Sequence, residues 1–421
     1  MPFSSLGLSP ALLRAVSAKA YLAPTPIQLA AIPAVLQGRD VLGSAQTGSG
    51  KTVAFALPLL QQLENRPLER PRRVRVLILV PTRELAAQVG EEIRELAQYQ
   101  PQAIKVAIVF GGVSINPQMM RLRGGADIVV ATPGRLLDLI AHKALALSDV
   151  TALVLDEADR LLDLGFAEEL TRILELLARQ RQNLFFSATF PLAVQTLAQK
   201  LLRDPVRIDV LPEPQTQPDI VQRVIEVDAG RRTQLLCHLI QQNAWSRVLV
   251  FVATKHAAEM IADKLRKARI YAEPFHGELS QGKRTQVLAD FKASRLKVVV
   301  ATDLAARGLD IEQLPVVVNY DLPRSALDYV HRIGRTGRAG ESGVALSFVR
   351  ADTEAHFRLI EKHQRLSLPR EHIAGFEPLP TATTAVTPSA EGTRSASATG
   401  GIKGKRPSKK DKLRQAAAWG Q

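Results

Sequence analysis

The sequence has little cysteine, few aromatic residues and no long apolar stretch. Cys237 is the single cysteine among 421 residues, which excludes an intramolecular disulfide or a cysteine-rich zinc module and is typical of a reducing compartment. No apolar run approaches the roughly 18 residues that a membrane span requires, and no basic-then-apolar leader opens the chain. We therefore expect a soluble, cytoplasmic protein without membrane contacts, in which Cys237 fills a core position.

The composition favours a folded protein with a polyanionic partner. Hydrophobic residues make up 46 % of the chain, enough for a sizeable core, and Lys and Arg outnumber Asp and Glu by 55 to 41. From about Pro378 the sequence turns to Thr, Ser, Ala, Gly and Lys, with eight basic and two acidic residues. Such a segment cannot bury enough apolar surface to fold alone. Its basic residues either bind nucleic acid or only keep the protein soluble.

Short runs rich in Val, Ile and Leu alternate with segments of helical period. The runs lack polar alternation, which is typical of strands buried on both faces of a parallel sheet. They lie at 74–80, 104–110, 127–131, 151–156, 183–188, 248–253, 297–301, 316–320 and 344–349. Helical patterns, for example at 84–98 and 166–180, intervene. The fold class is therefore α/β, with doubly wound parallel sheets.

A proline-rich break divides this pattern in two. The stretch at 209–218 contains prolines and few apolar residues, so it continues neither a helix nor a central strand. We expect an N-terminal domain over 1–208, a linker over 209–218, a C-terminal domain over 219–372 and a disordered basic tail over 373–421.

Residues 45–52 read AQTGSGKT between a strand-like and a helical segment. In such a loop, glycines let backbone N–H groups surround phosphate oxygens, and the following helix N-terminus favours the negative charge. Lys51 would reach the β- and γ-phosphates, and the Thr52 hydroxyl would bind Mg²⁺. Ala45 stands where the usual phosphate-loop pattern has its first glycine. The alternative is a glycine-rich turn with an unrelated lysine.

A second carboxylate site is expected where the strand at 151–156 ends. Asp156 would hold Mg²⁺, directly or through water, and Glu157 would orient or deprotonate the attacking water. Taken alone, such acidic residues usually belong to a solvated loop. The pairing with a phosphate loop about a hundred residues upstream favours the catalytic interpretation.

The second half of the chain contains HRIGRTGR at 331–338, in which Gly334 and Gly337 interrupt any regular helix. Because this half has no phosphate loop of its own, its arginines are candidates for groups that stabilise a γ-phosphate across a cleft, with Arg335 and Arg338 in that role. A solvated basic surface is the alternative.

These residues resemble the DEAD-box ATP-dependent RNA helicases, whose tetrad stands at Asp156, Glu157, Ala158 and Asp159. The resemblance runs in order from Phe3 to about residue 350. It covers YLAPTPIQ (21–28), AQTGSGKT (45–52), PTRELAAQ (81–88), Gly111–Gly112, TPGR (132–135), SAT (187–189), VLVFVATK (248–255), ATDLAARGLD (301–310) and HRIGRTGR (331–338). The opening FSSLGLSPALLRAV and the short basic tail look most similar to the bacterial RhlE-type branch. The resemblance implies two tandem RecA-like domains.

The resemblance also implies an ATP site with Mg²⁺. Gln28 would read the adenine edge, Tyr21 would stack on the adenine face and Phe3 would support that pocket, although Ala20 replaces the glycine that usually precedes the Tyr21 position. Tyr21 and Phe3 could instead be core aromatics. The remaining nucleotide contacts would come from Ala45, Gln46, Thr47, Gly48, Ser49, Gly50, Lys51, Thr52, Gly308 and Asp310.

RNA would bind a separate set of loops. The implied contacts are Pro81, Thr82, Arg83, Gly112, Thr132, Arg135, Thr254, Gln281, Arg284, Thr302 and Arg307. Hydroxyls, arginines and helix N-termini suit sugar–phosphate contacts, so binding would be largely independent of base sequence. Coupling between the two ligands would run through Asp159, Ser187, Thr189 and His331, with His331 as a hydrogen-bonding latch.

Two other functions stay open at this point. A DNA helicase or translocase would be stimulated by DNA, and a non-catalytic RNA clamp would lack turnover. The intact Lys51, Asp156, Glu157, Arg335 and Arg338 argue against a clamp. The resemblance further implies a bacterial cytoplasmic protein that acts in ribosome assembly or RNA turnover, with ribosomal precursors or the RNA-decay machinery as partners.

Overall fold

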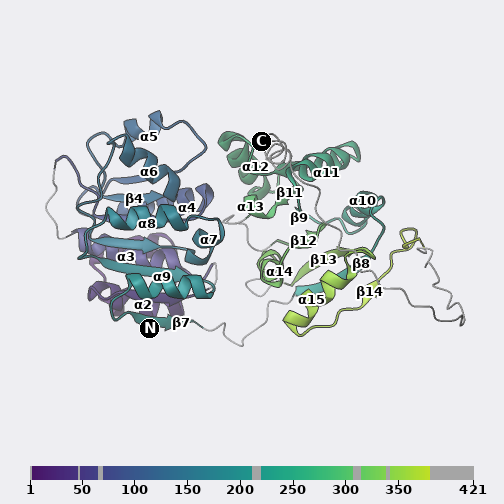
Figure 1. Ribbon diagram of the computed structural model, residues 1–421, viewed down its shortest axis with the longest axis horizontal. Coiled ribbons are helices and arrows are strands. Elements are labelled where there is room, and N and C mark those ends of the chain that lie inside the picture. The colour runs from purple at the N-terminus through teal and green to yellow at the C-terminus, as the bar shows by residue number, and fades with distance from the viewer. Residues whose placement is uncertain are drawn as a thin grey trace, which may run out of the picture. The chain divides into compact units, whose positions relative to one another are not determined.

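The computed structural model describes residues 2–45, 48–64, 70–210, 220–306, 314–337 and 342–379. They form two parallel sheets with helices on both faces, which we call the N-terminal lobe (2–210) and the C-terminal lobe (220–378) (Figure 1). No helix among these residues is long and apolar enough to cross a membrane.

Seven strands form the sheet of the N-terminal lobe, in the order β3-β4-β2-β5-β6-β1-β7 and all parallel. They are β1 (Val41–Ser44), β2 (Val76–Leu79), β3 (Val106–Val109), β4 (Ile128–Ala131), β5 (Ala152–Leu155), β6 (Gln182–Ser187) and β7 (Val206–Asp209). The side chains of β2, β4, β5 and β6 are buried on both faces of the sheet. This burial explains their continuous apolar sequences, since both faces of a parallel sheet are covered by helices.

Two helical layers cover this sheet. The first consists of the 3-10 helix η1 (Phe3–Leu6), α1 (Pro10–Ala18), α2 (Pro26–Leu36), α3 (Lys51–Glu64) and α4 (Arg83–Ala97). The second consists of α5 (Asn116–Arg121), α6 (Pro133–Ala141), α7 (Ala158–Asp163), α8 (Ala167–Glu175) and α9 (Leu192–Leu201). Ile78 and Phe186 belong to the first core, whereas Leu79 and Phe185 belong to the second, as the alternation of side chains along a strand requires.

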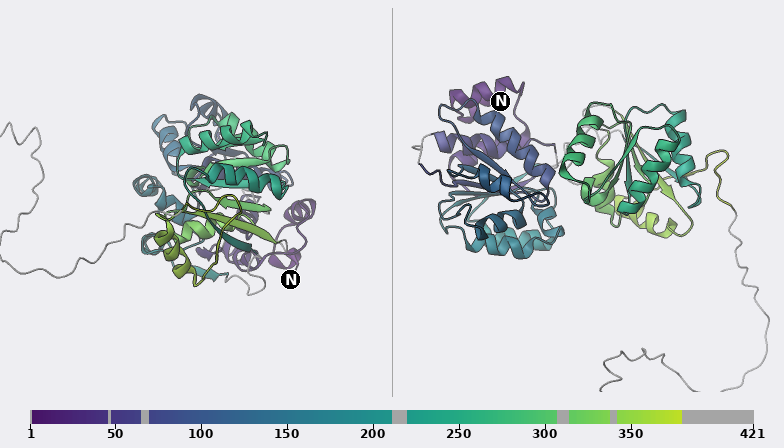
Figure 2. Two further views of the ribbon diagram at one scale, coloured as in Figure 1. Left: turned by 90° about the vertical axis from the view of Figure 1, so that its right-hand side faces the viewer. Right: turned by 90° about the horizontal axis from the view of Figure 1, so that it is seen from above.

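The C-terminal lobe repeats the arrangement with the order β10-β11-β9-β12-β13-β8-β14. Its strands are β8 (Ile220–Glu226), β9 (Val248–Val252), β10 (Ala272–Phe275), β11 (Val298–Thr302), β12 (Val316–Asn319), β13 (Gly343–Val349) and β14 (Arg370–Glu371). Its helices are α10 (Arg232–Gln242), α11 (Lys255–Lys267), α12 (Gln281–Lys292), α13 (Asp303–Ala306), α14 (Ala326–Ile333) and α15 (Glu354–Gln364). Figure 2 shows helices on both sides of each sheet.

Each predicted apolar run overlaps a strand of the structure, and the prediction of parallel sheets is confirmed. The helix expected over 166–180 is shorter, because α8 ends at Glu175. Strands β7, β8, β10 and β14 lie outside the predicted runs. Strand β10 contains Pro274, which is tolerated because β10 is the edge strand of its sheet. Helix α14 ends at Ile333 with Gly334 as its C-cap, as the glycines of 331–338 indicated.

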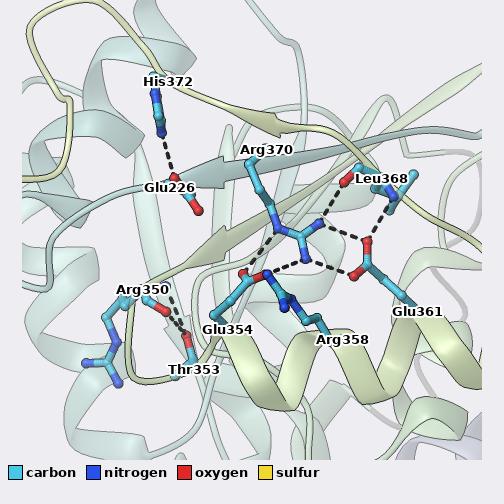
Figure 3. Close-up of polar contacts among 9 residues, drawn as sticks. All are labelled: Glu226, Arg350, Thr353, Glu354, Arg358, Glu361, Leu368, Arg370 and His372. Carbon is cyan, nitrogen blue, oxygen red and sulfur yellow. Dashed lines mark hydrogen bonds and ion pairs between the residues drawn. The ribbon is translucent and has the colours of Figure 1, made fainter.

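An ion-pair network fixes the last strand to the C-terminal lobe. The guanidinium of Arg370 in β14 donates to Glu354 at 2.9 Å and to Glu361 at 2.8 Å, both on α15 (Figure 3). The hydrogen bond from Arg370 holds the pKa of Glu361 below its ordinary value. Beyond β14, Phe376 packs on His238 with ring centroids 5.4 Å apart.

Residues 373–378 therefore belong with the C-terminal lobe, whereas the sequence assigned them to the tail. Ile373 and Phe376 pack against the core that contains α10 and α11. Residues 380–421 of the expected tail lie outside the described residues, as do residues 211–219, which contain most of the expected linker. Cys237 is half-buried against the same core, and burial raises the pKa of its thiol.

Candidate functional site

The sequence motifs of the N-terminal lobe meet at the carboxyl edge of its sheet. The strand order places β1, which precedes the phosphate loop, beside β6, followed by β5, β2, β4 and β3. Parallel strands end at the same edge, where ligands bind in open α/β sheets. The candidate phosphate residues follow β1 and β5, and the candidate RNA residues follow β2, β4 and β3. Ser187 at the end of β6 and Asp159 after β5 lie between the phosphate loop after β1 and the RNA candidates after β2.

Lys51 is the first residue of α3, and its side chain is buried. Its ammonium donates to the Ala45 carbonyl oxygen at 3.0 Å and so spans the loop from end to end. Gly48 and Gly50 have φ angles of 80° and 89°, which favour glycine at both positions. The loop thus has the turn and the helix N-terminus that phosphate binding requires. Gln46 and Thr47 lie outside the described residues.

Gln28 is attached to the phosphate loop. Its Nε2 donates to the Gly50 carbonyl at 3.1 Å, and its Oε1 accepts from the Thr25 backbone N–H at 3.0 Å. A Cβ on Gly50 would lie 2.4 Å from Gln28 Nε2, so only glycine permits this contact. An amide carries two donors and two acceptor lone pairs, so these two bonds use half of the capacity of Gln28. The other half suits the edge of a base.

The two candidate aromatic residues differ in burial. Phe3 lies in η1 and is buried in the first core of the N-terminal lobe. Tyr21 is half-buried against that core, and its hydroxyl donates to Glu92 Oε1 on α4 at 2.7 Å. Phe3 is therefore a core residue in this structure, whereas Tyr21 is partly exposed.

The acidic pair follows β5, and both side chains are buried. The backbone N–H of Glu157 donates to Asp156 Oδ1 at 3.0 Å. Glu157 has a left-handed backbone with φ 53°, a conformation that is unfavourable for a non-glycine residue. Its Oε2 lies 3.3 Å from Arg160 Nη1. A strained backbone at one of two adjacent buried carboxylates is typical of a functional site.

Burial raises the pKa of Asp156 to about 6, although nearby Lys51 acts in the opposite direction. The folded protein therefore binds this proton more tightly than the unfolded chain, and stability is lost as the pH rises from about 4 through 6. EDTA is added to remove any bound metal ion. Under these conditions the free energy of unfolding of Asp156→Asn should be roughly 2 kcal/mol higher than that of the wild type at neutral pH. Urea denaturation across this pH range measures the difference, which should vanish near pH 3.

The exposed Glu168→Gln substitution is the control for that experiment, and it should leave the pH dependence of the wild type unchanged. A gain in stability from Asp156→Asn that is the same at all pH values would contradict the expected titration of Asp156.

Three of the four candidate coupling residues contact one another. Asp159 Oδ2 accepts from Thr189 Oγ1 at 2.7 Å and from the Thr189 backbone N–H at 3.0 Å. Ser187 Oγ accepts from the Asp159 N–H at 3.2 Å and donates to the Thr189 carbonyl at 2.7 Å. The ends of β5 and β6 are therefore joined by a closed polar network. His331, the fourth residue, is half-buried on α14, and burial lowers its pKa to about 4.

Three candidate RNA residues of the N-terminal lobe, namely Arg83, Thr132 and Arg135, contact the loop at 111–113. Arg83 lies against Gly112, since a Cβ there would meet its guanidinium at 2.0 Å. The Thr132 hydroxyl accepts from the Gly111 N–H at 3.3 Å. Arg135 is buried and donates to the Val113 carbonyl at 2.7 Å, while its Nε and Nη1 have no hydrogen-bond partner among the described residues. Nε still lies 3.6 Å from Asp138 Oδ2 as an ion pair. A guanidinium with unused hydrogen-bond donors suits an incoming phosphate.

Pro81 and Thr82 lie at the start of helix α4. The Thr82 hydroxyl accepts from the Leu85 N–H at 3.2 Å and caps α4, with Pro81 directly before it. The same geometry recurs in the C-terminal lobe, where Thr254 caps α11 by accepting from the Ala257 N–H at 3.1 Å. These threonines have a structural role as caps, which is compatible with a ligand at the same helix ends.

The other candidates of the C-terminal lobe follow neighbouring strands. Gln281 begins α12 after β10, Thr302 ends β11, and the Arg284 guanidinium stacks 4.8 Å from the Phe275 ring centroid. Strands β10, β11 and β9 are adjacent in the sheet, so Thr254 falls in the same row. Gly308, Asp310, Arg307 and Arg338 lie outside the described residues.

The arginines of 331–338 do not share one role. Arg332 is buried and donates to both oxygens of Asp303, at 2.6 and 2.7 Å, and to Asn319 Oδ1 at 3.0 Å. Its guanidinium also stacks on Phe251 at 4.9 Å. Arg332 thus holds α13 and α14 on the sheet. Arg335 follows the end of α14 and is buried as well.

The sequence did not indicate two contacts at these sites, that of Tyr21 with Glu92 and that of Arg332 with Asp303. Glu92 lies in an ordinary amphipathic helix, so no local signal separates it from the other glutamates of α4. Asp303 could have been proposed from the sequence, because it directly follows Thr302 in the motif at 301–310.

The fold and the site define a nucleotide-binding α/β protein with a phosphate loop, a buried acidic strand end and a second lobe. Residues 25–197 match the family model of the DEAD/DEAH box helicases, and residues 231–340 match the model of the helicase conserved C-terminal domain. The chain is 40 % identical to the DEAD-box ATP-dependent RNA helicase CshA of Bacillus cereus, over 87 % of this chain and 69 % of CshA. It is 41 % identical to the ATP-dependent rRNA helicase rrp3 of Sclerotinia sclerotiorum, over 89 % and 78 %.

Among solved structures, Saccharomyces cerevisiae Dbp5 bound to RNA and ADP BeF3 matches with a TM-score of 0.77 at 31 % identity, over 88 % of this chain and 95 % of Dbp5. The chain belongs to the DEAD-box ATP-dependent RNA helicases. Its fold is accordingly a tandem of two RecA-like domains, and its ligands are ATP and RNA.

Proposed function

We propose that this protein uses ATP hydrolysis to separate short RNA duplexes locally and to remodel RNA–protein complexes, by closing its two lobes around ATP and RNA. One observation carries the proposal. The Asp159–Ser187–Thr189 network joins β5 and β6, between the phosphate loop after β1 and the RNA candidates after β2. The loss of the γ-phosphate on hydrolysis would therefore be transmitted to the RNA-binding residues through a short chain of hydrogen bonds.

The nucleotide site has a donor set that fits Mg²⁺. Asp156 is buried with one oxygen held by a backbone N–H, and the Thr52 hydroxyl lies in the first turn of α3. No cluster of three metal-ligating side chains occurs in the described part of the chain, which suits a cation that binds through one or two carboxylates, water and phosphates. When bound, Mg²⁺ would neutralise charge on the phosphate oxygens.

Protein groups would supply the other steps. Lys51 moves from the Ala45 carbonyl to the β- and γ-phosphates, and Glu157 orients the attacking water and accepts its proton. Arg335 and Arg338 stabilise the charge that develops on the γ-phosphate when the lobes close. Gln28 reads the adenine edge, Tyr21 stacks on its face, and Gly308 and Asp310 contact the nucleotide from the C-terminal lobe.

RNA would bind through its sugar–phosphate backbone along both lobes. Arg83, Arg135 and Arg284 would contact phosphates, and the helix starts at Thr82, Thr132 and Thr254 add N–H groups. Gly112, Gln281, Thr302 and Arg307 complete this surface. His331 would act as a neutral hydrogen-bonding partner of Asp159, because a pKa of about 4 leaves its ring uncharged at neutral pH.

Stacking energies limit how much duplex one cycle can open. At about 1.4 kcal/mol per step, taken from DNA, ten base pairs cost about 14 kcal/mol. Closure that disrupts a few pairs would thus release short duplexes, whereas long ones would resist. Unwinding assays on duplexes of increasing length should show rates that fall steeply with length. Rates that do not depend on length would contradict local disruption.

ATP turnover tests the substrate assignment. We expect RNA to stimulate hydrolysis strongly, DNA not to do so, and Arg338→Ala to abolish the stimulation. Turnover that is driven by DNA, or that is independent of RNA, would overturn the assignment. RNA binding without turnover would favour a clamp.

The proposal extends to the branch of the family, the cellular location and the partners of the protein. We place the protein in the RhlE-type branch, in a bacterial cytoplasm, acting on ribosomal precursors or with the RNA-decay machinery. We retain an N-terminal domain over 1–208 and an RNA-tethering tail, and we extend the C-terminal domain from 219–372 to 219–378, because Ile373 and Phe376 pack on its core. Deleting 380–421 should weaken RNA binding at low salt, because basic residues near the core raise the local RNA concentration.

A further inference from the structure

The segment between α1 and α2 is attached to α4 by two side chains. Tyr21 Oη donates to Glu92 Oε1 at 2.7 Å, and Lys19 Nζ lies 3.4 Å from Glu92 Oε2. Lys19 also forms an ion pair with Glu95, one turn further along α4. Glu92 therefore contacts both residues that flank Ala20, although more than seventy positions separate it from them in the sequence.

The backbone of this segment is strained. Ala20 has a φ of 55°, in the left-handed region that is unfavourable for a residue with a Cβ. Glycine, which has no Cβ, would adopt this conformation freely. In this chain the conformation persists with Lys19 and Tyr21 both bonded to α4. The two side-chain contacts thus add to the backbone hydrogen bonds that close this turn at the end of α1, from the Ala20 N–H to the Ser17 carbonyl at 3.0 Å and from the Tyr21 N–H to the Val16 carbonyl at 3.2 Å.

The hydroxyl of Tyr21 is a permanent donor in this arrangement. Burial, together with the hydrogen bond to Glu92, raises the pKa of Tyr21 above its usual range. One part of the ring packs on the core, and the hydroxyl fixes the far end of the ring. A ring held at both ends has lost its freedom before a ligand arrives, so stacking costs less conformational entropy.

We propose that Glu92 is a positioning residue that orients the Tyr21 ring for the adenine of ATP. The inference rests on the proposed function, in which Tyr21 stacks on the base. It adds a part of the site, on α4, that the motifs around the phosphate loop do not contain. It also gives the tyrosine hydroxyl a role that phenylalanine at this position could not fill.

Steady-state ATP hydrolysis with saturating RNA tests this role. Tyr21→Phe and Glu92→Ala should each raise KM for ATP about five-fold, the effect of losing one hydrogen bond, with kcat unchanged. The double variant should be no worse than either single one, because both remove the same contact. Glu92→Gln keeps an acceptor for Tyr21 and should restore KM to nearly the wild-type value.

Two controls separate positioning of the ring from a general structural effect. Glu91→Ala alters the adjacent glutamate of α4, which is exposed and pairs only with Arg94 among the described residues, and should leave KM unchanged. Inorganic tripolyphosphate, which has no base, should inhibit the wild type and Glu92→Ala equally.

Wild-type KM values in Tyr21→Phe and Glu92→Ala would overturn the inference. A weaker inhibition by tripolyphosphate in Glu92→Ala would also overturn it, since the whole phosphate site would then have changed. Failure of the proposed function gives a different result, because hydrolysis by the wild type would then not depend on RNA.

Discussion

Lys51→Ala is expected to lower RNA-stimulated ATP turnover about 100- to 1,000-fold, the usual cost of removing one preorganised donor from a developing charge. The ammonium of Lys51 is the cation at the phosphate loop that the structure places beside Asp156 and the Ala45 carbonyl. Its loss leaves the γ-phosphate without this partner in the transition state. Phosphate release at saturating RNA and ATP measures the effect.

Lys200→Ala is the matched control, because Lys200 is an exposed lysine near the end of α9 in the same lobe. It should retain wild-type turnover. The melting temperature of Lys51→Ala should be recorded in parallel, so that lost activity is not mistaken for unfolding. Turnover by Lys51→Ala within a few-fold of the wild type would contradict the phosphate-loop role.

Arg332→Ala is expected to lower the free energy of unfolding of the C-terminal lobe by about 1–3 kcal/mol, because it leaves the buried Asn319 amide oxygen without its hydrogen bond. The guanidinium is 3 % exposed and bonds to Asp303, Asn319 and the Asp321 carbonyl. Removing it leaves the Asp303 carboxylate and the Asn319 amide without this partner. Urea denaturation of the full chain, followed by circular dichroism, should show the transition of this lobe at a lower urea concentration.

Arg358→Ala provides the comparison for Arg332. Arg358 is 74 % exposed and pairs with Glu354 on the surface of α15, so its loss should cost under about 0.5 kcal/mol. Similar stabilities for Arg332→Ala and Arg358→Ala would show that the buried network does not hold the lobe together. Loss of turnover in Arg332→Ala would then need a direct catalytic explanation.

This contrast separates two arginines that the sequence presents as equivalent. Arg332 and Arg335 share one motif at a three-residue spacing, and only their surroundings distinguish them. Because α14 ends at Ile333, Arg332 still points from a helix onto the sheet, whereas Arg335 follows the helix. The end of the helix at Gly334 could be predicted, but the partners Asp303 and Asn319 could not, since they lie on other elements.

The sequence alone determined the class of fold, the family and the local position of most site residues. Continuous apolar runs indicate strands buried on both faces, and the motifs lie directly after those runs, so they meet at one sheet edge. The position of Asp156 at the end of β5 also follows from the sequence, because the preceding residues are apolar, whereas the burial of its side chain was shown by the structure.

Only the tertiary structure decided which distant side chains meet. The order β3-β4-β2-β5-β6-β1-β7 does not follow the order of the strands in the chain, and it places the Asp159 network between the two candidate ligand sites. The contact between Tyr21 and Glu92 depends on how α4 packs over this sheet. A sequence pattern encodes which face of a helix or strand is buried. Contacts between distant side chains depend instead on how the helices and strands are placed relative to one another, and that placement arises only when all of them pack together.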